Sequence, residues 1–152
     1  MELATTVLIL HAGLAAVWDI AQRRIPNWLI VSGLLFGIAF NAQSSGLAGL
    51  GFAVLGALTA LAVLIGPFAI RWMGGGDVKI AMVCGAFTGW SGALHIILVG
   101  TVVHGLLGLL VLFSRAARKA MGHTLEKPRQ LPHAVGFGIA AVLYAAGVAR
   151  FF

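Results

Sequence analysis

Long apolar runs, separated by short polar or glycine-rich breaks, fill most of the chain. Each run approaches the ~20 residues that an α-helix needs to cross the hydrocarbon core of a bilayer. The pattern predicts six helical spans, at residues 3–17, 28–42, 47–70, 78–90, 92–113 and 134–151. The fourth span is short for a full crossing, and Pro67 is expected to bend the end of the third. The predicted fold is therefore all-α, a polytopic membrane protein with a single transmembrane domain over residues 1–152.

Composition favours a membrane protein over a soluble domain. The 152 residues are 61% hydrophobic and 9% charged, whereas a soluble domain carries about 25% charged residues. The net charge of +6 does not come from a basic patch with interleaved aromatic residues, so no nucleic-acid partner is expected. The single cysteine, Cys84, excludes an intrachain disulfide and a cysteine-cluster metal site. Glu2 and no basic residue precede the first apolar run, which favours a retained helix over a cleaved signal peptide.

The basic residues predict how the chain is oriented in the bilayer. Nine of the ten Lys and Arg residues fall at the junctions after the first, third and fifth spans, and Arg150 is the exception. Cytoplasmic loops carry such an excess of positive charge, so these junctions are expected in the cytoplasm and both termini outside. Trp18, Trp28 and Trp72 lie at the same span ends, as interfacial anchors do.

The acidic residues are few, and two of them have a suggestive placement. Asp19 follows the first span and Asp77 precedes the fourth, whereas Glu2 and Glu126 lie at the N-terminus and in the long polar loop. In a compact bundle both aspartates would meet at the cytoplasmic end. Two carboxyl groups in one partly dry site do not both ionise easily. One then serves as base toward a water molecule while the other polarises a carbonyl, which suggests peptide-bond hydrolysis.

Three glycines, Gly74, Gly75 and Gly76, directly precede Asp77. They are expected to allow positive φ angles and close approach to an extended substrate backbone. Simpler interpretations stay open for the charged residues. Asp77 would suit the N-cap of a helix, Asp19 would suit a pair with Arg23, and Lys79 would suit an interfacial anchor.

Two motifs carry a family resemblance. Residues Gly74 to Lys79 read GGGDVK, which is similar to a GxGDxK motif, and Asp19 is followed by Ile25-Pro26-Asn27. With these motifs the sequence resembles the type IV prepilin peptidase family, of the GxGD intramembrane aspartyl proteases, over essentially its whole length. A weaker match is Leu131-Pro132-His133, where the usual tyrosine-glycine after the proline is replaced by His133-Ala134.

The resemblance implies a function and a set of site residues. Asp19 and Asp77 match the catalytic pair, Gly74 and Gly76 the fixed glycines, and Lys79 the motif lysine. The chain lacks a methyltransferase insert and paired zinc-binding cysteines, so it resembles the short form associated with tight-adherence (Flp-type) pili. Such a protein would sit in the bacterial inner membrane. It would remove leader peptides from prepilins and pseudopilins at the cytoplasmic face, after a glycine, without metal or cofactor.

Two other functions remain open from the residues alone. A small transporter or proton channel would use Asp19, Asp77 and Lys79 as a relay. A non-enzymatic membrane scaffold of a secretion system would need no aspartate pair.

The remaining polar and small residues are expected to act in packing. Pro26 and Asn27 would end a turn and cap the second span, and the loop over residues 114–133 would connect two spans beside anionic headgroups. Packing or helix–helix hydrogen bonds are expected of His11, His95 and His104. Close helix approach is predicted at the pairs Gly33/Gly37 and Gly85/Gly89.

Overall fold

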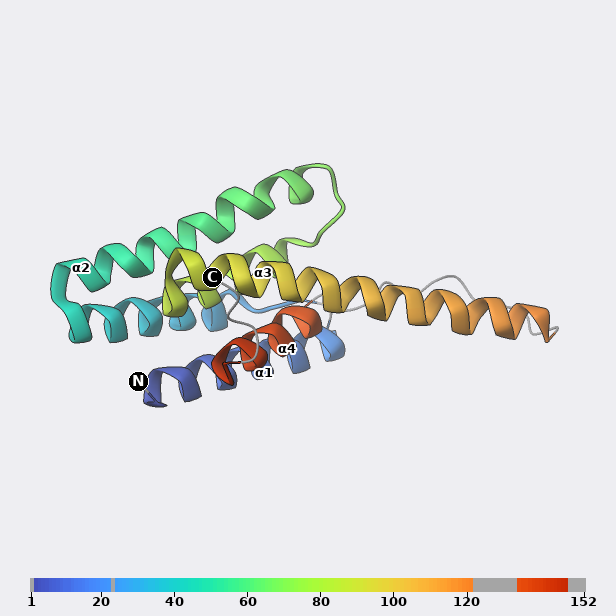
Figure 1. The fold of residues 1–152 in the computed structure, drawn as a ribbon, viewed down its shortest axis with the longest axis horizontal. Helices are drawn as coiled ribbons and strands as arrows, with labels where there is room; N and C mark the ends of the chain where they lie inside the picture. Colours follow the sequence, from blue (N-terminus) through green and yellow to red (C-terminus); the bar gives the residue numbers. More distant parts are fainter. Residues whose placement is uncertain (1, 23, 122–133, 148–152) are drawn as a thin grey trace.

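The computed structural model describes residues 2–22, 24–121 and 134–147. In this part the chain forms four helices and no strand: α1 (Glu2–Gln22), α2 (Asn27–Ala69), α3 (Gly75–Ala120) and α4 (Ala134–Ala145). They lie side by side as a bundle, and only the far end of α3 extends beyond it (Figure 1). The prediction of an all-α fold is confirmed.

Three helices are long and apolar enough to cross a membrane, in the segments Leu3–Gln22, Asn27–Ala69 and Gly75–Ala116. The twelve residues of α4 reach about 18 Å at 1.5 Å per residue, which is less than the ~30 Å core of a bilayer. The six spans and the outside position of both termini stay predictions. The end of the sixth predicted span, after residue 147, lies outside the described residues, as does the Leu131-Pro132-His133 segment.

Helix α2 consists of two arms that meet at Ser45 and Gly46. Both residues leave the helical region, and Gly46 has a φ of 58°, a left-handed conformation that glycine adopts at little cost. The second arm runs back from the break and diverges from the first (Figure 1). This reversal coincides with the gap predicted between the second and third spans. Pro67 lies inside the helix only two residues before its end, and the non-helical residues of α2 are elsewhere.

Helix α3 also reverses direction, at Gly89, with φ 72° and ψ −174°. The break leaves carbonyl groups at the end of the first arm without helical partners. The side-chain amide of Asn41 on α2 donates to two of them, Ala86 O at 3.0 Å and Phe87 O at 3.3 Å. This polar contact between α2 and α3 stabilises the break, which separates the predicted fourth and fifth spans.

Glycines bring α2 and α3 into backbone contact. A Cβ atom added at Gly56 would meet the carbonyl group of Gly85, and one added at Gly85 would meet that of Gly56. Gly33 lies against the Val83 side chain, and Gly37 lies against Ala86 in the same manner. The close approach predicted from spacing is therefore confirmed at Gly33, Gly37 and Gly85.

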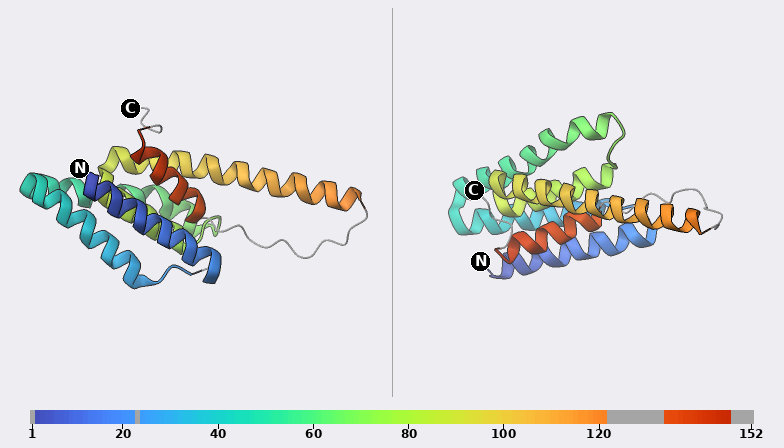
Figure 2. Two further views of the ribbon diagram at one scale, coloured as in Figure 1. Left: turned by 90° about the horizontal axis from the view of Figure 1, so that it is seen from below. Right: turned by 45° about the vertical axis from the view of Figure 1, so that its right-hand side comes forward.

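Helix α4 lies between α1 and the second arm of α3 (Figure 2). Phe137 of α4 fills the space above Gly100, and Gly138 of α4 lies beside Ala12 of α1. On the other side of α1, His11 Nε2 lies 3.4 Å from the Ser32 hydroxyl of α2. The expected packing and hydrogen-bonding role is confirmed at His11, which is partly buried.

Candidate active site

Asp77 occupies the third position of α3 and turns back onto the chain that precedes the helix. Its backbone N–H donates to Gly74 O at 3.1 Å, and its Oδ2 accepts from the Gly74 N–H at 3.1 Å. This is the second half of a capping box, in which an acidic side chain satisfies a backbone donor at the helix start. The simpler interpretation of Asp77 as the N-cap residue is therefore wrong, because Asp77 is the third residue of the helix. Only 4% of the residue is exposed.

The three glycines before Asp77 pack against neighbouring segments. In the described part of the chain, the glycines with positive φ are Gly46, Gly89 and Gly147, so the prediction of positive φ angles at residues 74–76 is wrong. Their lack of a side chain leaves room for neighbouring residues. A Cβ atom at Gly76 would lie 3.3 Å from the Ile25 side chain, and one at Gly75 would lie 3.3 Å from Phe68. Small residues let the start of α3 fit closely against the neighbouring segments.

Asp19 lies in the last turn of α1, partly buried. Its side chain interacts electrostatically with that of Asp77, so the fold brings together the two aspartates, from the end of one helix and the beginning of another. The end of α1 and the start of α3 share one end of the bundle (Figure 1). The predicted pair of Asp19 with Arg23 lies outside the described residues, because Arg23 is not among them.

Lys79 makes a contact that the sequence did not reveal. Its Nζ donates to Asn27 Oδ1 at 2.8 Å, across 52 residues of sequence. Asn27 is the first residue of α2, and Pro26 occupies the N-cap without a side-chain capping bond. The predicted capping role of Asn27 is therefore wrong. In the sequence, this bond was indicated only by the presence of an asparagine in one motif and a lysine in the other.

Residues two apart on a helix point in different directions. Asp77 therefore faces the bundle interior, where it is buried, whereas Lys79 is exposed and faces the start of α2. The relay that would join Lys79 to the two aspartates gains no support from this arrangement.

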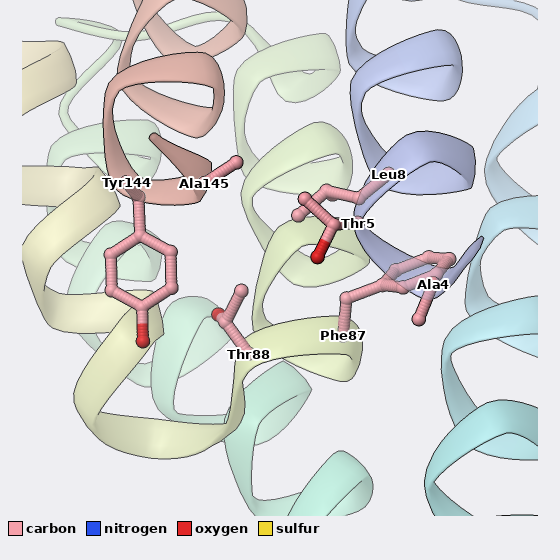
Figure 3. A pocket seen from close by; sticks show the side chains of 7 residues that line it. All are labelled: Ala4, Thr5, Leu8, Phe87, Thr88, Tyr144 and Ala145. Atoms are coloured by element: carbon pink, nitrogen blue, oxygen red, sulfur yellow. The ribbon is translucent and has the colours of Figure 1, made fainter. Parts of the chain in front are cut away.

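The rest of the described chain offers no candidate metal site. Over residues 2–22, 24–121 and 134–147, no group of three His, Cys, Asp or Glu side chains is placed to hold a metal ion. A cavity of about 60 Å³ lies between α1, α3 and α4 (Figure 3). It is lined by Ala4, Thr5, Leu8, Phe87, Thr88, Tyr144 and Ala145. Leu8 precedes Asp19 by roughly 16 Å along α1, so this cavity is separate from the aspartates.

Comparison with known proteins identifies the family. A family model described as the type IV leader peptidase family matches residues 6–109, a range that contains both aspartates, the three glycines and Lys79. No curated protein and no solved structure matches the chain. The family match covers more than half of the sequence and confirms the resemblance found in its motifs. The chain belongs to the type IV leader peptidase family, whose members are membrane-embedded peptidases.

Proposed function

We propose that the protein is an intramembrane aspartyl endopeptidase that removes the leader peptide from type IV prepilins and pseudopilins at the cytoplasmic face of the membrane. The observation that carries this proposal is that Asp19 and Asp77 lie near enough to interact electrostatically. These are the two aspartates of the chain, and they come from different helices of a bundle that otherwise presents mostly apolar side chains. Family membership supports the peptidase reaction.

The proposed mechanism uses the two carboxyl groups as a pair that shares one proton. The ionised member accepts a proton from a water molecule, and the water oxygen attacks the carbonyl carbon of the scissile peptide bond. The protonated member donates to the carbonyl oxygen as the tetrahedral intermediate forms. Collapse of that intermediate breaks the C–N bond, and the departing amine takes up the proton that the base accepted. A hydroxyl group of the intermediate returns a proton to the carboxylate that had donated one, which restores the pair.

The surroundings of Asp77 favour such chemistry because they fix its position. The Gly74 N–H holds one carboxyl oxygen at 3.1 Å, and the packing of α3 against Ile25 holds the backbone. A carboxyl group that is already oriented loses little freedom when the reaction begins.

The outer faces of the helices suggest how a substrate reaches the pair. Large apolar side chains are exposed along α1, α2 and α3, such as Leu14, Leu35 and Leu106. The apolar segment of a prepilin would approach through the lipid and lie against these helices. Its scissile bond would then be at the aspartate end, and its leader would be in the cytoplasm. No methyl-donor site was expected from the sequence, so the product would leave without N-methylation.

Co-expression with a prepilin from a tight-adherence pilus tests the proposal. Asp19→Asn and Asp77→Asn keep the size of each side chain and remove its ability to ionise. Each is expected to abolish leader removal, while the amount of protein in the membrane stays unchanged. Mass spectrometry of the pilin measures whether the leader has been removed. Glu126→Gln is the matched control, because it removes a carboxylate outside the pair. Normal processing by either aspartate variant would exclude the mechanism and favour a carrier or scaffold.

A further inference from the structure

The two motifs of the family are joined by one side-chain hydrogen bond. Lys79 Nζ donates to Asn27 Oδ1 at 2.8 Å. Lys79 belongs to the second turn of α3, two residues after Asp77, and Asn27 begins α2. A lysine that served only as an interfacial anchor would extend toward headgroups and water. Here the ammonium group instead meets an amide oxygen on another helix.

The bond lies beside a second contact between the same segments. Ile25, in the turn between α1 and α2, is 8% exposed and lies next to Gly76, the residue before Asp77. The turn is therefore held against the start of α3 by an apolar contact and by a charge-assisted hydrogen bond two residues further along. Charge-assisted bonds are the stronger class of protein hydrogen bonds.

The turn held in this way carries one of the two aspartates. Asp19 lies in the last turn of α1, which leads directly into this turn. Asp77 lies between the two contact points on α3, Gly76 and Lys79. From this geometry we infer that Lys79 and Asn27 form a lock that positions Asp19 beside Asp77. Both are positioning residues, and neither touches the substrate.

This inference rests on the proposed function for its effect on the reaction, but the lock itself is testable without any substrate. In a Cys84→Ala background, Ile25→Cys places a single thiol at the one buried position of the turn among its described residues. Wild-type Lys79 and Asn27 should keep it slow to react with a maleimide in membrane vesicles. Lys79→Ala or Asn27→Ala should expose the turn and raise the labelling rate about tenfold. The double variant should label no faster than either single variant, because one bond is lost in all three.

Kinetics then separate positioning from other roles. In the native-cysteine protein, Lys79→Ala and Asn27→Ala should each lower kcat about tenfold with KM nearly unchanged. Lys79→Arg and Asn27→Asp keep a donor and an acceptor and should retain activity. The exchanged pair Asn27→Lys with Lys79→Asn should recover much of what either exchange alone loses. Arg71→Asn is the matched control, since it removes a positive charge from the same end of α3 and asparagine tolerates the φ of 60° at that position.

Several results would overturn the lock. Unchanged labelling in both alanine variants would show that the bond does not hold the turn. Faster labelling with full activity would show that the turn does not position the aspartates. A raised KM with unchanged kcat would make Lys79 a substrate contact. If the wild-type protein cleaved no prepilin, the proposed function would fail, and the labelling result alone would decide whether the lock exists.

Discussion

Asp19 at the end of α1 and Asp77 at the beginning of α3 interact electrostatically at one end of the bundle. If these two carboxyl groups share one proton, they act as a unit, and removing either one removes the catalytic activity of the pair. The double variant Asp19→Asn with Asp77→Asn is therefore expected to process a prepilin no more slowly than either single variant. Single-turnover rates on a purified prepilin measure this. If the fold-decrease in rate of the double variant equalled the product of the two single decreases, the two carboxyl groups would act independently.

Gly76 is predicted to tolerate alanine but not valine. A Cβ atom there would lie 3.3 Å from the Ile25 side chain, so a methyl group requires a small shift and a β-branched side chain requires a larger one. Gly76→Val is expected to lower activity at least about tenfold with a smaller effect on the amount of inserted protein. Gly76→Ala should stay close to wild type.

Shortening the side chain at Ile25, which would clash with a larger residue at Gly76, provides the control for this prediction. Ile25→Ala combined with Gly76→Val should recover part of the lost activity, because the shortened side chain makes room. Full activity of Gly76→Val alone would mean that the start of α3 does not need to fit against the turn.

Gly89 is predicted to be hard to replace without a loss of stability. Its φ of 72° disfavours any L side chain, and the Phe52 ring occupies the space that a Cβ atom would need. Gly89→Ala should destabilise the protein by about 1–3 kcal/mol or more, measured as thermal unfolding in detergent. Gly105→Ala is the matched control, because Gly105 is helical and has open space around its Cα. It should be neutral or slightly stabilising, and equal effects at the two positions would contradict the role of the break.

Asn41 is predicted to hold the reversal of α3 in place. Its amide donates to carbonyl groups on both sides of the α2–α3 contact, including Ala86 O and Phe87 O. Asn41→Asp keeps the size and removes the donor, so it should destabilise the protein by about 1–3 kcal/mol. Ser44→Ala removes an exposed hydroxyl that bonds only to its own turn, at Asn41 O, and should have little effect. An Asn41→Asp protein as stable as the wild type would remove this role.

Local patterns were sufficient for much of the fold. The apolar runs predicted helical segments, and the breaks at Ser45–Gly46 and Gly89 fall in or next to the predicted gaps. The spacing of Gly33 and Gly37 predicted a close approach, because small residues on one helix face permit it whichever helix lies opposite. The likeness to GxGDxK pointed to Asp77 and the Ile25-Pro26-Asn27 element pointed to Asp19, and the family match confirms the family that both suggested.

Contacts between distant segments were beyond the reach of the sequence. The Lys79–Asn27 bond joins residues 52 apart, and the Asn41 contacts with Ala86 and Phe87 span 45 and 46. No periodicity in one segment specifies the partner in another, since that choice depends on how the helices pack. Glycine at residues 74–76 is compatible both with positive φ angles and with close packing. Only the folded structure showed that close packing applies here.

The crossing of Gly56 and Gly85 fixes how closely the short first arm of α3 lies on α2. With no side chains between the two backbones, a larger residue at either position would push the arm outward. Gly85 stands eight residues from Asp77, roughly 12 Å along the helix, so a tilt of about 10° at the crossing would shift the aspartate by about 2 Å. A substitution at this distance would therefore alter the spacing of the two carboxyl groups without touching either of them.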